Sequence, residues 1–228
     1  MTRATTTEPA CAFSTAVGID VGGARKGFHA VAITGGDYSA HLATKNAEQL
    51  VHWSRVTMRA RVVAVDAPCR WSKDGRARPA ERELMENKIW CFSTPTRQRA
   101  LDYPGNHYGW MLRGEAVFRA LEPTYPLCRE LPVVDGRDTS IETFPHAIAW
   151  HVSQGRAVAS RKREQREELL KRAGIDTSRL TNIDLIDAAL GALVAYRIAT
   201  GAPCVSYGEP DTGLILVPAF DPAVNEGA

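Results

Sequence analysis

The run Val62-Val63-Ala64-Val65 constrains the fold more than any other part of the chain, because every position in it is apolar. A strand with one face in water alternates apolar and polar residues, so an unbroken apolar run indicates a strand covered on both faces. A helix is predicted just before it, over residues 46–57, with Asn46 and Gln49 as a capping pair. A helix that leads into a doubly covered strand is typical of an α/β protein with parallel central strands.

The chain before this run predicts a three-stranded antiparallel meander over residues 16–21, 28–34 and 38–44, with glycine-rich turns between the strands. The rest of the chain predicts further strands and helices. The strands are expected at 139–144, 204–207 and 214–217, and the helices near 80–90, 108–121, 160–172 and 182–200 and after Pro145. We therefore expect a mixed sheet, with an antiparallel meander and parallel strands, flanked by helices.

The length of 228 residues fits one large domain or two small ones. The order of the motifs described below favours a single domain over 15–218, with an irregular helical segment at about 69–131. Residues 1–14 are expected to form a disordered leader and residues 219–228 a loose tail. The 28 Lys and Arg residues nearly balance the 26 Asp and Glu residues. This balance argues against a protein that coats nucleic acid by charge alone, but it leaves room for a local basic groove.

The five cysteines indicate a reducing, cytoplasmic setting, because they are odd in number and never spaced as in a zinc cluster. No apolar run in the sequence approaches the roughly 20 residues that span a bilayer, so no membrane partner is expected.

Four carboxylates stand among apolar neighbours, where an isolated charge is costly: Asp20, Asp66, Glu142 and Asp187. If they converge, their mutual repulsion requires cations. Oxygen ligands without Cys or His favour Mg²⁺ or Mn²⁺. Two such ions can activate a water and stabilise the leaving oxygen of a phosphodiester, so the four acids are the predicted metal ligands and catalytic residues.

Structural explanations for these acids stay open beside the functional one. Asp66 precedes Ala67-Pro68 and could be a turn residue. Glu142 could form an ion pair with an arginine such as Arg166. Asp184 lies three residues after Thr181 and is expected to be a capping acid at a helix start rather than a ligand.

The segments that carry these acids occur in an order that resembles the DUF429 family, whose members are predicted nucleases of the ribonuclease H-like fold. They are residues 17–20, 65–68, 141–145 and 184–189, and residues 78–82 and 166–170 also resemble that family's pattern. The resemblance covers about residues 17–217. It implies a ribonuclease H-like mixed sheet, with Asp20, Asp66, Glu142 and Asp187 as metal ligands.

Basic residues gather in two stretches, 70–113 and 156–172, and aromatic residues are interleaved with the first. This mixture suits a single-stranded or irregular nucleic acid. A charged helix at 161–172 is more often a solvated face, Trp90 and Phe92 are expected in the core, and the polar segment 93–99 is the predicted phosphate-contacting loop. The predicted nucleic-acid-binding residues are Arg78, Arg82, Arg97, Arg99, Lys162 and Arg166.

These patterns predict a nuclease that hydrolyses DNA or RNA with Mg²⁺ or Mn²⁺, through two bound ions. Two alternatives stay open. Residues 18–23 resemble the first phosphate loop of actin-like ATPases and sugar kinases, which would make the chain an ATP-dependent phosphotransferase, although no second glycine-rich loop accompanies it. The other alternative is a binding module that keeps the fold without turnover.

Overall fold

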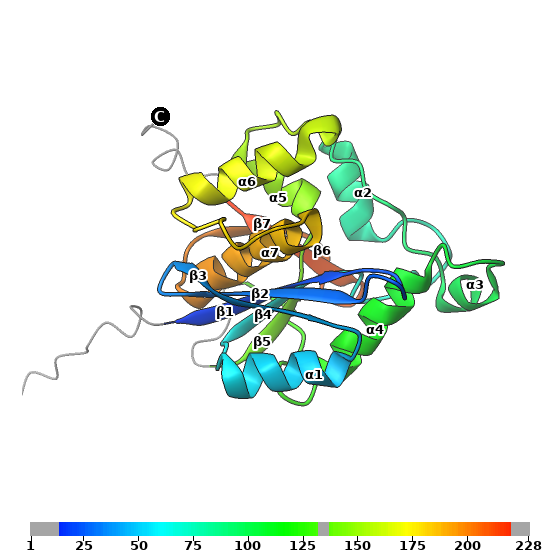
Figure 1. Ribbon diagram of the computed structural model, residues 1–228. Coiled ribbons are helices and arrows are strands. Elements are labelled where there is room, and N and C mark those ends of the chain that lie inside the picture. Colours follow the sequence, from blue (N-terminus) through cyan, green and yellow to red (C-terminus); the bar gives the residue numbers. More distant parts are fainter. Residues whose placement is uncertain (1–13, 132–136, 220–228) are drawn as a thin grey trace, which may run out of the picture.

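A seven-stranded mixed sheet forms the centre of the protein (Figure 1). The computed structural model describes residues 14–131 and 137–219, so the predicted leader and tail lie outside the described residues except for Ser14 and Ala219. The strands are β1 (Thr15–Val21), β2 (Phe28–Thr34), β3 (Asp37–Thr44), β4 (Val62–Asp66), β5 (Thr139–Glu142), β6 (Cys204–Glu209) and β7 (Gly213–Pro218).

The strand order is β3-β2-β1-β4-β5-β7-β6. The first three strands pair antiparallel, as the meander prediction requires, and β4 and β5 join β1 in parallel. The apolar run therefore occupies the centre of the sheet, and its side chains alternate between the two hydrophobic cores. The predicted mixed α/β sheet is confirmed.

Helices cover both faces of this sheet (Figure 1). One face carries α7 (Ile183–Ala199), with α5 (Pro145–Val152) and α6 (Lys162–Arg172) packed beside it. The opposite face carries α1 (Ala47–His52) and α4 (Gly109–Leu121). Two shorter helices, α2 (Pro79–Glu86) and α3 (Arg97–Asp102), lie in the segment between β4 and α4. In the part of the chain that the structure describes, no helix has the length and apolarity to cross a membrane.

Two helix ends differ from the sequence-based expectation. The helix predicted over 46–57 begins as expected, since the Asn46 side chain accepts hydrogen bonds from the amides of Glu48 and Gln49, but its last turn is π-helical over Trp53–Thr57. Helix α2 ends at Glu86, before the predicted end at residue 90, because Lys88 takes a left-handed conformation with φ of 63°.

The early end of α2 overturns one prediction. Trp90 and Phe92 were expected in the core, but they lie 75% and 70% exposed in the irregular segment that follows the helix. The buried position after α2 is held by Ile89 instead.

Helix α7 rests directly on β1 because Gly18 has no side chain. A Cβ atom at Gly18 would lie 2.0 Å from the carbonyl oxygen of Ala188 and 2.1 Å from the amide nitrogen of Ala192. Gly191 completes the contact from the helix side, where an added Cβ would meet the Cα of Gly18 at 3.5 Å. This contact places the first half of α7 against the strand that carries Asp20.

Candidate metal centre

Three polar side chains form a row across neighbouring strands. Asp20 of β1 lies opposite Asp66 of β4 in parallel register and opposite His29 of β2 in antiparallel register. Residues that are paired in this way point to the same face of a sheet. The row therefore faces α7, at the carboxyl ends of the parallel strands, where α/β sheets place their ligands.

Helix α7 adds two carboxylates above this row, Asp184 and Asp187. The helix starts after Asn182, whose side chain accepts a hydrogen bond from the amide of Leu185 at 2.9 Å. Asn182 is thus the capping residue, and the expectation that Asp184 caps the helix together with Thr181 is wrong. Both oxygens of Asp184 instead accept hydrogen bonds from the Lys26 amine, at 2.8 and 3.0 Å.

Asp20, His29 and Asp184 together could hold a metal ion, because each offers a ligand atom and these atoms all lie within 4.8 Å of one another. His29 is not among the ligands predicted from the sequence, and Asp184 was expected to be a capping acid. The sequence signal that could have pointed to His29 is the predicted hairpin, because a short turn after residue 21 brings residue 29 opposite residue 20. The exact register of the two strands depends on the geometry of the folded turn, so the pairing could not be read from the sequence alone.

Asp187 is buried and forms an ion pair with Arg166 of α6. The alternative in which Glu142 pairs with an arginine is confirmed, but its partner is Arg78 instead of Arg166. The ion pair between Arg166 and Asp187 also ties α6 to α7 directly beside the carboxylates.

The carboxylate cluster (Asp20, Asp66, Asp184 and Asp187) is electrostatically unbalanced. Burial raises the pKa of Asp20 to about 7, and repulsion from Asp187 and Asp184 adds to this effect against the opposing influence of Lys26 and Arg166. Burial also raises the pKa of Asp66 well above its ordinary value, with Asp20 as the foremost repelling charge. The pKa of Asp187 is raised by burial even though Arg166 contacts it.

A divalent cation would correct this imbalance. Among the described residues, two cationic side chains contact the carboxylate cluster, so four ionised acids would leave two negative charges uncompensated. Burial lowers the pKa of His29, which favours the neutral imidazole, and its Nδ1 is buried with no hydrogen-bond partner in the described part of the chain. Neutral imidazole nitrogen and carboxylate oxygen are both ligands of divalent metals, so these residues fit a metal ion.

Glu142 lines a small cavity together with Asp66, and its charge adds to the repulsion that raises the pKa of Asp66, but its hydrogen-bond partners differ from those of the carboxylate cluster. It pairs in register with Val65 rather than Asp66, so the alternation of side chains directs it to the opposite face of the sheet. Both of its oxygens accept hydrogen bonds from Arg78, at 2.9 and 2.6 Å, and the amide of Cys69 donates another at 2.8 Å. Asp20, Asp66 and Asp187 face α7, whereas Glu142 reaches Asp66 from the side of Arg78, and the assignment of all four as metal ligands stays a prediction.

Arg78 joins Glu142 to the start of α2. Its Nε bonds to Glu81 at 2.8 Å, and all three side chains of this network are at most 4% exposed. Glu81 also accepts a hydrogen bond from the amide of Thr94 at 3.0 Å, which connects the segment after α2 to the same network. These contacts anchor the irregular segment 69–131 to the end of β5.

The predicted nucleic-acid-binding residues separate into two groups. Arg78 and Arg166 are buried and bonded to acids, so neither presents its charge on the surface. The exposed ones are Arg82, Arg97, Arg99 and Lys162. The segment predicted as a phosphate-contacting loop is partly helical, since Thr96 caps α3 and places Arg97 and Arg99 in its first turn.

A family model matches residues 18–212, a region that starts at the glycine beneath α7 and includes the whole carboxylate cluster. The chain belongs to the DUF429 family. DUF429 is described as a family of proteins of unknown function, so membership assigns no reaction. No curated protein and no solved structure matches this DUF429 chain.

Proposed function

We propose that this DUF429 protein is a hydrolase of phosphodiester bonds that depends on Mg²⁺ or Mn²⁺ and acts on nucleic acid. The observation that carries the proposal is the convergence of Asp20, Asp66 and Asp187 on one face of the sheet, with raised pKa values, beside a buried and unpartnered imidazole nitrogen. When bound at such a site, a pair of divalent ions lowers the pKa of a water and stabilises the leaving oxygen of a phosphodiester.

The central position of Asp20 suits it to contact both ions. It pairs with Asp66 on one side and with His29 on the other, so it lies between two possible groups of ligands. Asp184 would join the group on the side of His29. Arg166 would hold Asp187 in place through their buried ion pair and would limit how much negative charge the metals must neutralise.

Exposed aromatic residues near this edge support a nucleic-acid substrate. Trp90, Phe92 and Tyr103 are 75%, 70% and 41% exposed, and aromatic surfaces of this kind stack on unpaired bases. Phe92 also lines a cavity of about 60 Å³ together with Asp66. A single strand lying over the ring of Phe92 would lead towards Asp66, and Arg99, which is exposed in α3, offers a phosphate contact.

The arrangement of the sheet supports the same assignment. The meander β1–β3 is joined through α1 to the parallel strand β4, which is the mixed sheet that the family resemblance implies for a ribonuclease H-like nuclease. The phosphotransferase alternative loses its main support, because the amides of Gly22 and Gly27 are bonded within the turn, to Gly27 and Gly23, instead of being free for a phosphate.

The test is cleavage of labelled single-stranded DNA, single-stranded RNA and duplex DNA with Mg²⁺, Mn²⁺ or a chelator. We expect metal-dependent cleavage of at least one substrate, and we expect Asp20→Asn and Asp66→Asn each to abolish it. Asp138→Asn is the matched control. Asp138 directly precedes the first residue of β5, at the end of that strand away from Glu142, and it forms a half-exposed ion pair with Arg61. Cleavage that survives both substitutions, or no cleavage of any substrate, would overturn the proposal.

A further inference from the structure

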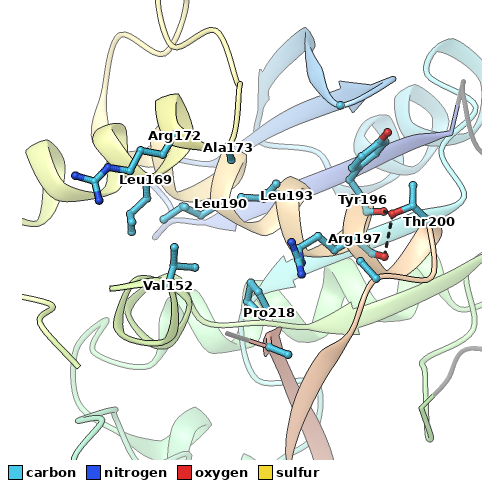
Figure 2. Close-up of a pocket in the computed structure, with 13 residues that line it drawn as sticks. Val152, Leu169, Arg172, Ala173, Leu190, Leu193, Tyr196, Arg197, Thr200 and Pro218 are labelled. Carbon is cyan, nitrogen blue, oxygen red and sulfur yellow. Dashed lines mark hydrogen bonds between the residues drawn. The ribbon is translucent and has the colours of Figure 1, made fainter. Parts of the chain in front are cut away.

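A cavity of about 350 Å³ lies between α5, α6, α7 and the end of β7, and the carboxylate cluster takes no part in its lining (Figure 2). Its wall is apolar, with side chains that include Val152, Leu169, Leu190, Leu193 and Pro218. Small-molecule sites have volumes of roughly 300–1,000 Å³ and combine an apolar wall with a few polar groups. The cavity therefore has the size and the wall of a site for a small ligand.

Arg197 supplies a charged group to this apolar space. Figure 2 shows its guanidinium directed among the apolar side chains. Within the described residues no carboxylate bonds to it, and its Nε is buried without a hydrogen-bond partner. A buried donor without a partner destabilises the folded protein, so the fold alone gives no reason for this arginine.

The second arginine of the lining differs in both respects. Arg172 bonds to Glu168 at 3.1 Å, and in Figure 2 its guanidinium points away from the apolar side chains. Of the two arginines that line the cavity, Arg197 is therefore the one with a buried nitrogen that has no partner among the described residues.

We propose that this cavity binds a small monocarboxylate with an apolar body. The body would fill the space between Val152, Leu169 and Leu193, and the carboxylate would accept hydrogen bonds from the Arg197 guanidinium. A single guanidinium matches a single carboxylate in both charge and geometry, because its planar fork donates two parallel hydrogen bonds.

The site is separate from the carboxylate cluster, although α7 contributes to both. Arg197 follows Asp187 by ten residues, which corresponds to about 15 Å along a helix. Binding in the cavity can therefore be measured in a chelator without any metal or nucleic acid, and its outcome does not depend on the proposed nuclease activity.

The experiment is calorimetric titration of the full chain with decanoate, decanol and decyltrimethylammonium. These probes share an apolar body and differ in the charge of the head group. We expect saturable binding of one decanoate per chain, weaker binding of decanol by about tenfold or more, and no binding of the cation. Absence of saturable decanoate binding, or equal affinity for all three probes, would overturn the proposal.

Two variants test the role of the guanidinium. Arg197→Met should weaken decanoate binding by about tenfold or more and leave decanol binding unchanged, whereas the control Arg172→Met should change neither. Equal losses in the two variants would indicate a general effect of surface charge and would contradict the proposal.

A variant that fills the cavity keeps the proposal testable if an arginine substitution disturbs folding. Leu193→Trp should abolish the binding of both decanoate and decanol while thermal unfolding stays cooperative. Unchanged decanoate binding to a folded Leu193→Trp variant would place the ligand elsewhere and refute the site.

Discussion

The raised pKa of Asp20 predicts that the metal-free protein becomes more stable when this carboxylate is removed. Asp20→Asn keeps the size and shape of the side chain but cannot ionise. Between the ordinary pKa of 3.8 and the folded value of about 7, the folded protein retains a proton that the unfolded chain has lost. The stability associated with that proton is fully present below pH 3.8 and is lost as the pH rises to about 7.

The magnitude follows from the width of that pH interval. Each pH unit changes the free energy of unfolding by about 1.4 kcal/mol, so the charged Asp20 destabilises the metal-free protein by at most about 4 kcal/mol above pH 7. The Asn variant avoids this loss. It also relieves the repulsion that raises the pKa of Asp66.

The assay is urea denaturation in a chelator at a series of pH values from 4 to 8. The difference in unfolding free energy between Asp20→Asn and the unchanged protein should be near zero at pH 4 and should grow with pH until it levels off above pH 7. Asp138→Asn is the matched control, because its carboxylate is half exposed and such pairs contribute about 1 kcal/mol or less.

The opposite result would refute the reasoning. If Asp20→Asn were less stable than the unchanged protein at pH 8 in chelator, the Asp20 carboxylate would be stabilised by its surroundings and would need no metal. A difference that did not vary with pH would show that the proton is lost at its ordinary pKa.

Three further predictions concern stability. Divalent Mn²⁺ should raise the midpoint of thermal unfolding of the unchanged protein at pH 8 but not that of Asp20→Asn; equal shifts would point to another site. Arg78→Met should cost about 3–5 kcal/mol in urea denaturation, because it leaves Glu142 buried and unpaired; a loss below about 1 kcal/mol would contradict this. Gly18→Ala should cost about 3 kcal/mol or more, since its methyl would lie 2.0 Å from a backbone oxygen, whereas Gly23→Ala, with no atom nearer than 3.9 Å, should cost less than about 1 kcal/mol; equal costs would refute the close contact.

The sequence predicted the centre of the sheet because local signals suffice there. Turn glycines at 22–23 and 35–36 delimit the strands of the meander, and the apolar run at 62–65 identifies the buried strand. Asp20 and Asp66 end up side by side because both stand near the carboxyl ends of adjacent parallel strands. Their proximity therefore follows from the positions of the two acids within their strands.

The partners of the charged residues could not be predicted in the same way. Glu142 meets Arg78 across 64 positions of sequence, and Lys26 meets Asp184 across 158. Such contacts depend on how the irregular segment 69–131 folds back and on how α7 crosses the sheet, and neither leaves a local pattern in the sequence. The same limit explains why Trp90 was expected in the core: its exposure depends on the end of α2.

The contact between Gly18 and Gly191 also sets the distance between α7 and β1 at one point along the helix. Gly191 lies four residues after Asp187 and six residues before Arg197, or about 6 Å and 9 Å along the helix axis. Because backbone lies against backbone at these glycines, α7 has no room to move closer to β1 at this point. Any tilt of α7 about this contact would therefore move its end with Arg197 and its end with Asp187 in opposite directions relative to the sheet.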